Sequence, residues 1–471
     1  MMMGIAEAAR ALNAGIRGGD VAFDAVNTDS RAIKRGDLFV ALKGERFDGH
    51  RFVPQAAAAG AVAAMVEDSG FGIQDPEFSL PLIVVKDTRL ALGRLGAYWR
   101  SKFTIPLVGL TGSSGKTTVK EMLALILREA AGVESRILNP ESCVLATRGN
   151  LNNDIGVPLM LLELRPEHRY AVIEMGMNHA GEIRYLTRLA APDVALVNNA
   201  GRAHIEYLGS EEAIARAKGE IFEGLKAGGT AVINADEHFA DLWRELAAGR
   251  KQLEFGTEKP AAVTATYRLR FLDSEIVVKT PHGQAGATLN AAGLHNVKNA
   301  LAASAVAAAL DVAPRVIAAG LARFAGVKGR LQKKACLHGA TLIDDTYNAN
   351  PESVRAAIAV LAQAPGSKLL VLGDMGELGP AAPALHAEIG VLAHEAGIDR
   401  LFTLGELSAH AAQAFGRNAR HFSRIEDLLA EIENLLAPEV TVLIKGSRFM
   451  QMERVVRSFE LKPDTQSVGH G

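Results

Sequence analysis

A short run of glycine, hydroxyl and lysine residues around position 115 has the composition of a phosphate-binding loop. It follows a buried-strand pattern at residues 105–110 and precedes a helical pattern at residues 119–130. Glycines let backbone amides point at phosphate oxygens, Lys116 supplies positive charge, and Thr117 offers a hydroxyl to Mg²⁺. A glycine-rich strand–turn–helix junction without a ligand is the alternative. The residues expected to hold phosphates are Gly112, Ser113, Ser114, Gly115, Lys116, Thr117 and Thr118.

Two other side chains follow predicted strands and are candidate metal ligands. Glu174 ends the apolar run at residues 170–173, and His204 follows the run at residues 194–197 after a polar loop. Parallel α/β folds bind ligands at the carboxyl ends of their strands, and Mg²⁺ takes carboxylates together with phosphate and water. Glu174 is alternatively a surface carboxylate at a strand end, and a single loop histidine is more often solvated.

Lys218 lies on the apolar face of a predicted helix, which is unusual for a lysine. Ile214, Ala217, Ile221 and Leu225 recur around it at helical spacing. An inward-facing lysine either extends its amine to the protein surface or serves chemistry as a neutral amine. A neutral amine can add CO₂ to give a carbamate, an anion able to bind Mg²⁺. Spacing alone favours the first alternative.

Three α/β segments must position these residues, as expected for a chain of 471 residues. We expect a small N-terminal α/β domain at 1–85, a central P-loop domain with a parallel sheet at 86–313, and a C-terminal Rossmann-like domain at 314–471. The central strand-like runs are apolar at every position, as in strands covered on both faces. Residues 267–280 have the pattern of an antiparallel hairpin. The third segment alternates strands and helices without a dinucleotide fingerprint.

The composition excludes several classes of protein. The 51 basic and 53 acidic residues nearly cancel, which leaves no electrostatic footprint for nucleic acid or a membrane surface. The longest apolar stretch, residues 300–310, falls far short of the ~20 residues that span a bilayer. Glu7 and Arg10 interrupt the apolar residues that a signal peptide would need. Two distant cysteines, Cys143 and Cys336, cannot form a disulfide framework, and we expect a reducing cytoplasm.

The order of motifs along essentially the whole chain resembles the Mur ligase family, which builds the peptide of bacterial peptidoglycan. General phosphate loops have a glycine where this chain has Leu110, but a leucine is ordinary in that family. The motifs that carry the resemblance lie at residues 28–31, 36–42, 47–50, 111–118, 149–153, 174–176, 204, 217–222, 294–300, 329–330, 344–351, 373–379 and 445–448.

The resemblance implies an activity, its cofactors and its partners. It implies an ATP- and Mg²⁺-dependent carbon–nitrogen ligase that joins D-alanyl-D-alanine to UDP-N-acetylmuramoyl-tripeptide, as a monomer in the bacterial cytoplasm. The carboxylate would be activated as an acyl phosphate before the amine attacks. The segments at 47–50 and 344–351 favour this branch over other Mur ligases and folylpolyglutamate synthase-like enzymes, which remain alternatives. A P-loop NTPase or kinase would use the same loop without needing the first domain or Lys218.

The resemblance also implies roles for individual residues. Glu174, His204 and a carbamylated Lys218 would hold a second Mg²⁺, while Thr117 would contact the first. Asn296 would face the adenine, Arg330 the γ-phosphate, and Asp345 the ribose. Residues expected along the UDP-substrate path are Ser30, Arg31, Asp48, His50, Asn150, Asn152 and Asn153. Residues expected to position the dipeptide or close the site are Tyr347, Asn348, Asn350, Lys445 and Ser447. The catalytic set is Lys116, Glu174, Lys218, His204 and Arg330.

Two of these motifs have local structural interpretations that the residues leave open. Residues 48–50 alone form a turn pattern. Asn350 followed by Pro351 is the pattern of a helix N-cap, with proline at the first helical position.

Overall fold

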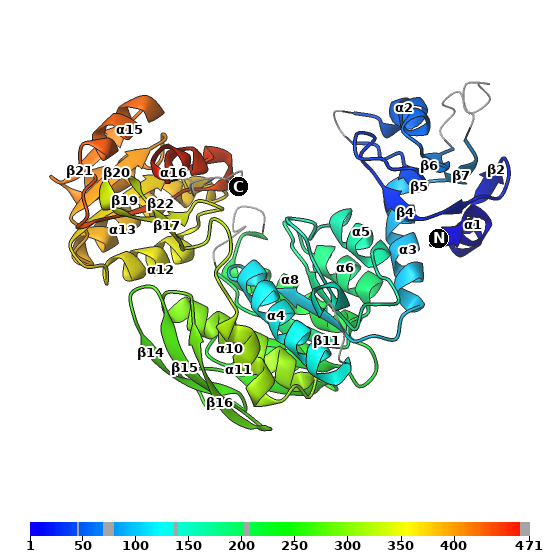
Figure 1. Ribbon diagram of the computed structural model, residues 1–471, viewed down its shortest axis with the longest axis horizontal. Helices are drawn as coiled ribbons and strands as arrows, with labels where there is room; N and C mark the ends of the chain where they lie inside the picture. Colours follow the sequence, from blue (N-terminus) through cyan, green and yellow to red (C-terminus); the bar gives the residue numbers. More distant parts are fainter. Residues whose placement is uncertain (45–46, 69–79, 136–139, 202–207, 462–471) are drawn as a thin grey trace, which may run out of the picture.

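The chain forms three α/β units that follow one another along the sequence and lie in an arc (Figure 1). The computed structural model describes residues 1–44, 47–68, 80–135, 140–201 and 208–461. The N-terminal and C-terminal units lie at opposite ends of the arc, with the central unit between them. The predicted three-part α/β architecture is confirmed. Within the described residues, no helix has the length and apolar character needed to cross a membrane.

The N-terminal unit is built on a five-stranded sheet that is parallel except at one edge pair. Two short strands, β1 (Met3–Gly4) and β3 (Ala22–Phe23), pair beside it. The helices of this unit are α1 (Ile5–Leu12) and α2 (Val53–Ala58). The order of the sheet is β2 (Gly15–Arg17), β7 (Leu82–Val85), β6 (Ala63–Glu67), β5 (Asp37–Val40) and β4 (Ala25–Asn27).

Helix α3 (Thr88–Ser101) joins this unit to the central one. Asp87 caps its first turn by accepting a hydrogen bond from the amide of Leu90 at 2.8 Å. Near its other end, the Tyr98 hydroxyl donates to Glu7 in α1 at 2.8 Å. The Trp99 indole donates to the carbonyl of Leu164 at 3.0 Å, so one helix contacts both units.

The central unit has a fully parallel six-stranded sheet between two helical layers. Alternate residues of each strand pack on opposite faces: Val108 and Leu110 lie against α4 (Lys116–Ser135) and α10 (Leu294–Ala309), while Leu107 lies against the other layer. That second layer contains α3, α5 (Gly156–Leu162), α6 (Glu182–Ala190), α8 (Glu211–Gly219) and α9 (Ala240–Leu246). The sheet order is β13 (Lys251–Phe255), β12 (Thr230–Asn234), β11 (Val194–Val197), β8 (Leu107–Thr111), β10 (Tyr170–Glu174) and β9 (Val144–Ala146).

A small antiparallel sheet extends the central unit. The predicted hairpin is β14 (Thr264–Leu269) paired with β15 (Ser274–Thr280), and a third strand, β16 (Gly283–Leu289), pairs with β15. Its inner face packs on α10 and on α11 (Pro314–Ala322).

The C-terminal unit is a six-stranded sheet, parallel except for its edge strand β17. Helices α12 (Pro351–Leu361), α13 (Ala382–Glu395) and α14 (Ala409–Phe415) cover one face, while α15 (Ile425–Glu433) and α16 (Glu453–Phe459) cover the other. Helix α16 begins only at Glu453, because Gln451 shortly before it is left-handed with φ 51°. The order is β17 (Gln332–Ala335), β18 (Thr341–Asp345), β22 (Val440–Lys445), β19 (Ser367–Gly373), β20 (Arg400–Leu404) and β21 (Ala419–Phe422).

Candidate active site

A cavity of about 1060 Å³ lies where the carboxyl ends of the central strands face the C-terminal unit. Strands β10 and β11 both pair with β8 in parallel, so their carboxyl ends open on the same side of the sheet. The sequence-predicted residues that line it are Ser113, Ser114, Gly115, Lys116, Thr118, Asn150, Asn152, Asn153, Glu174, Asn296, Arg330, Asp345, Tyr347, Asn348, Asn350 and Lys445. The structure therefore brings together residues spread over more than half of the chain.

The phosphate-loop motif forms the predicted turn between β8 and α4. Gly115 has a φ of +77°, and a Cβ there would lie 2.3 Å from the Asn299 side-chain oxygen, so only glycine fits. The Lys116 ammonium donates to the Gly112 carbonyl at 2.7 Å, across the loop. Burial lowers the pKa of Lys116, while the carboxylate of Glu174 partly counteracts that shift.

Two asparagines at the end of β11 brace this loop. The Asn199 side chain accepts from the Ser114 amide at 2.8 Å and donates to the Ser114 carbonyl at 3.0 Å. It therefore holds both backbone polar groups of that residue. Asn198 is buried and donates to the same carbonyl at 3.1 Å and to Asn299 at 3.2 Å. Sequence reasoning missed both asparagines. Their position directly after the apolar run at residues 194–197 was the available signal.

A carboxylate, a hydroxyl and a guanidinium meet beside Lys116. The Thr117 hydroxyl donates to Glu174 Oε2 at 3.0 Å, and Asn152 donates to Glu174 Oε1 at 2.9 Å. Arg330 reaches from the C-terminal side and donates to the Thr117 hydroxyl at 3.2 Å. Its buried Nε has no hydrogen-bond partner among the described residues. A carboxylate beside a hydroxyl suits a divalent cation, and an unsatisfied guanidinium nitrogen suits a phosphate oxygen.

Lys218 is buried in α8, with 1% of its surface exposed. Burial holds the pKa of Lys218 well below its usual range, and the nearby positive charge of Lys116 acts in the same direction. The helix is fixed from behind by Trp243 in α9, whose indole donates to the Ala215 carbonyl at 2.9 Å. Burial and the neighbouring charge both lower the pKa of Lys218 and so favour the neutral form of its amine. His204, the third predicted ligand of the second cation, lies outside the described residues.

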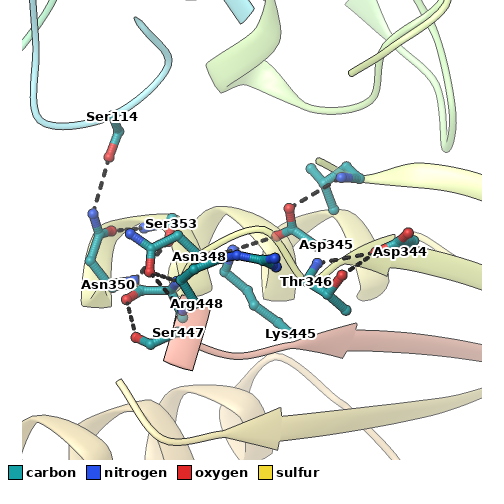
Figure 2. Close-up of polar contacts among 12 residues, drawn as sticks. Ser114, Asp344, Asp345, Thr346, Asn348, Asn350, Ser353, Lys445, Ser447 and Arg448 are labelled. Carbon is teal, nitrogen blue, oxygen red and sulfur yellow. Dashed lines mark hydrogen bonds and ion pairs between the residues drawn. The ribbon is translucent and has the colours of Figure 1, made fainter. Parts of the chain in front are cut away.

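The C-terminal wall of the cavity is a hydrogen-bonded cluster at the carboxyl ends of β18 and β22 (Figure 2). The buried Lys445 ammonium contacts Asp345 Oδ2 at 2.6 Å and donates to the Asn348 carbonyl at 2.9 Å. Ser447 is also buried; its hydroxyl donates to the Ala349 carbonyl at 3.0 Å and accepts from the Gly376 amide at 2.8 Å. Ser447 thus holds two loops of this wall together.

Asn350 has both a structural role and a place at the site. Its Oδ1 accepts from the Ser353 amide at 2.8 Å and forms the capping box of α12, as the local pattern indicates. Its Nδ2 points toward the phosphate loop and donates to the Ser114 hydroxyl at 3.4 Å (Figure 2). Tyr347 lies below the guanidinium of Arg330, 4.4 Å from ring centre to Cζ. The hydrogen bond from Asn350 to Ser114 joins the two units across the cavity.

The asparagines predicted to line the substrate and nucleotide paths take up different positions. Asn296 opens α10, where it is buried and donates to the Ala292 carbonyl at 2.8 Å. Asn153 is exposed, and its side-chain oxygen accepts from the amide of Gly156, the first residue of α5, at 2.8 Å. Asn150 lines the cavity.

The structure does not bring the predicted UDP-contacting residues of the first unit to this cavity. Ser30 is near the surface and donates to Gln55 at 3.3 Å, while exposed Arg31 pairs with Asp29. Asp48 and His50 form a turn in which the imidazole donates to the carboxylate at 2.6 Å and accepts from the Glu67 amide at 2.8 Å. Residues 48–50 therefore form the turn that their local sequence pattern indicates.

Comparison with known proteins points to the family that the sequence motifs resemble, over almost the whole chain. Residues 22–100 match the model "Mur ligase family, catalytic domain", 110–307 the "Mur ligase middle domain", and 329–448 the "Mur ligase, glutamate ligase domain". UDP-N-acetylmuramoyl-tripeptide--D-alanyl-D-alanine ligase from Escherichia coli is 43% identical, over 95% of this chain and 96% of its own length.

Two solved structures share the fold at high coverage. UDP-N-acetylmuramoylalanyl-D-glutamyl-2,6-diaminopimelate--D-alanyl-D-alanyl ligase from Acinetobacter baumannii is 39% identical, with a TM-score of 0.84 over 97% of each chain. MurF ligase from Thermotoga maritima in complex with ADP is 28% identical, with a TM-score of 0.79 over 92% of this chain and 96% of that one. On motifs, site and matches together, the chain belongs to the Mur ligase family.

Proposed function

We propose that the protein is an ATP-dependent ligase that adds D-alanyl-D-alanine to UDP-N-acetylmuramoyl-tripeptide, in peptidoglycan synthesis in the bacterial cytoplasm. The observation that carries this proposal is the shared cavity, in which the phosphate loop, Glu174 and Arg330 face the cluster around Lys445. Nearly full-length relatives bear the name of this activity, and one was solved with ADP. The enzyme acts as a monomer.

The reaction matches the groups that the cavity provides. A carboxylate oxygen of the tripeptide attacks the γ-phosphorus of ATP, the bond to the β-phosphate oxygen breaks, and ADP leaves. The amine of D-alanyl-D-alanine then attacks the acyl phosphate, phosphate departs, and the nitrogen loses a proton. Phosphoryl transfer depends on in-line positioning and charge neutralisation. Lys116 and the guanidinium of Arg330 would supply the positive charge, and the Nε of Arg330 has no hydrogen-bond partner among the described residues.

The residues of the site fit Mg²⁺. Thr117 and Glu174 already lie 3.0 Å apart, oxygen to oxygen, and would hold cations together with His204 and a carbamate on Lys218. The neutral amine is the form that adds CO₂, and the burial of Lys218 lowers its pKa toward that form, which supports this role. When bound, Mg²⁺ supplies positive charge next to the phosphate oxygens.

We assign the three predicted domains separate tasks. Residues 1–85 bind the UDP end of the substrate through Ser30, Arg31, Asp48 and His50, residues 86–313 bind ATP, and residues 314–471 position the dipeptide. Asn296 faces the adenine and Asp345 the ribose. The UDP-contacting residues lie away from the cavity, and the extended nucleotide–sugar–peptide substrate would span the distance between them and the phosphate loop.

A substrate-dependence experiment tests the assignment. ADP release should require both UDP-N-acetylmuramoyl-tripeptide and D-alanyl-D-alanine, and the pentapeptide product should appear by mass spectrometry in equal amount. Equal ATP turnover without either substrate would instead indicate a P-loop NTPase or kinase.

The carbamate has its own test. Lys218→Ala should abolish ligation, bicarbonate should not restore it, and a small carboxylic acid should restore part of it. The control is Lys251→Ala at the exposed sheet edge, which should keep full activity. Activity of Lys218→Ala equal to that of the unmodified protein would contradict the carbamate.

A further inference from the structure

One end of the cavity is lined by an ion pair that the proposed mechanism does not use. Arg89 in the first turn of α3 pairs with Asp154 just before α5. Its Nη2 donates to Asp154 Oδ1 at 2.8 Å, and its Nε donates to Oδ2. Both residues line the cavity together with Leu90 and Tyr185. Three elements from different parts of the chain, α3, the segment before α5, and α6, therefore converge on this point.

Close packing of α3 on α6 fixes the geometry of this end. Gly93 lies one helical turn after Arg89 on the same face of α3, and a Cβ there would come within 2.0 Å of the Tyr185 hydroxyl oxygen. The absence of a side chain lets that hydroxyl lie against the helix. Burial, followed by the negative charges of Asp154 and Asp87, raises the pKa of Tyr185, so the hydroxyl stays protonated and able to donate.

The pair contributes little to holding the fold together. Arg89 is 55% exposed and Asp154 31%, and ion pairs this accessible contribute little to folding stability. Asp154 is not needed to cap α3, because Asp87 already accepts from the Leu90 amide. Water and a ligand can both reach the two charges, and each keeps further hydrogen-bonding capacity: the guanidinium has five N–H donors and the carboxylate about four acceptor sites.

The pair lies a short distance from the reacting groups. Asn152, two residues before Asp154, donates to Glu174 at 2.9 Å. Two residues of extended chain span at most about 7 Å, so the backbone at Asp154 lies close to that of Asn152, and both residues line the cavity together with Glu174. In the proposed reaction the third residue of the tripeptide carries the reacting carboxylate, so its side chain starts at the phosphate loop, in the same cavity that Arg89 and Asp154 line.

We propose that Arg89 and Asp154 bind a free amino-acid group at the end of that third side chain, as found in 2,6-diaminopimelate. Arg89 donates to the remote carboxylate and Asp154 accepts from the remote ammonium, so a zwitterion matches the pair with both charges satisfied. A lysine side chain offers an ammonium alone and leaves Arg89 without a partner from the substrate. The inference rests on the proposed ligase function. It makes Arg89 and Asp154 the residues that determine which third residue of the tripeptide the protein prefers.

Steady-state kinetics with two substrates tests the proposal. UDP-N-acetylmuramoyl-tripeptides with diaminopimelate or lysine at the third position are compared at saturating ATP and D-alanyl-D-alanine. The expected KM is about tenfold lower for the diaminopimelate substrate, the size of one charge-assisted bidentate contact. Arg89→Ala should raise that KM about tenfold, leave kcat nearly unchanged, and leave the lysine substrate unaffected. Asp154→Asn should raise KM for both tripeptides, since both carry the ammonium.

Arg94, in the same helix as Arg89, provides a matched control. Arg94→Ala removes an exposed arginine from the same helix outside the cavity and should change neither KM. Equal effects of Arg89→Ala on both tripeptides would overturn the assignment, as would an effect confined to the KM of D-alanyl-D-alanine, itself a zwitterion. Failure of both tripeptides to support ADP release would contradict the ligase function instead, so the two failures are distinguishable.

Discussion

Replacing Lys445 by methionine should destabilise the C-terminal unit more than its single ion pair suggests. Lys445 is 2% exposed, and its ammonium is the donor to Asp345 Oδ2 at 2.6 Å and to the Asn348 carbonyl at 2.9 Å. Methionine fills similar volume but leaves a buried carboxylate without its cation. Breaking a buried pair from one side costs about 3–5 kcal/mol. With a urea m-value of about 2 kcal/mol/M, the unfolding midpoint should fall by about 1.5–2.5 M.

Urea titration of the full chain followed by circular dichroism measures this shift, and the double variant tests its cause. Lys445→Met with Asp345→Asn removes both charges and should recover at least half of the loss. Burial already raises the pKa of Asp345, so in Lys445→Met the carboxyl takes up a proton as the pH falls. The deficit should therefore be smaller at pH 5 than at pH 8. A midpoint shift under about 0.5 M, or a double variant less stable than the single one, would refute the reasoning.

Two further predictions concern the loops at the site. Asn199→Ala removes both hydrogen bonds to the Ser114 backbone and should raise the KM for ATP by about tenfold or more, with little change in Tm; an unchanged KM would show that the loop needs no brace. His386, fully buried, donates to the Ala382 carbonyl and accepts from the Met375 amide, and burial lowers its pKa below 6.5. The contribution of His386 to stability is complete above pH 6.5 and declines as the pH falls toward its folded pKa. In His386→Gln the urea unfolding midpoint should therefore change less between pH 7.5 and pH 5 than in the unmodified protein. An equal change with pH in both proteins would contradict this.

Local patterns account for what the sequence predicts correctly. The turn from β8 into α4 needs only glycine, a buried strand and a helix, and all three are readable within a dozen residues. Helical spacing correctly places Lys218 among apolar neighbours, but the alternative that spacing alone favours, an amine extended to the surface, is wrong, because Lys218 is 1% exposed. Strand alternation likewise predicts the pairing of β14 with β15. Strand β16 escapes notice because its residues, rich in glycine and alanine, carry no clear alternation.

Contacts between distant segments are the part that no local pattern encodes. Asn199 and Ser114 are 85 positions apart, and Arg89 and Asp154 are 65 apart, so their partnership depends on the parallel sheet and its helical layers. Asp48 shows the reverse case, because the residues at 48–50 satisfy one another within a turn and lie away from the cavity. The roles assigned by family resemblance to the first unit therefore stay predictions.

The two tryptophans of this chain lie at two separate places in the fold. Intrinsic fluorescence can therefore report a change in the surroundings of each place. Trp243 is hydrogen-bonded to the helix that carries Lys218, so its emission samples the electrostatic field around that amine. Trp99 is hydrogen-bonded to Leu164 near the junction with the first unit, so its emission would report a rotation of that unit. A single-tryptophan protein made by Trp99→Phe or Trp243→Phe would separate the two signals, without any attached dye.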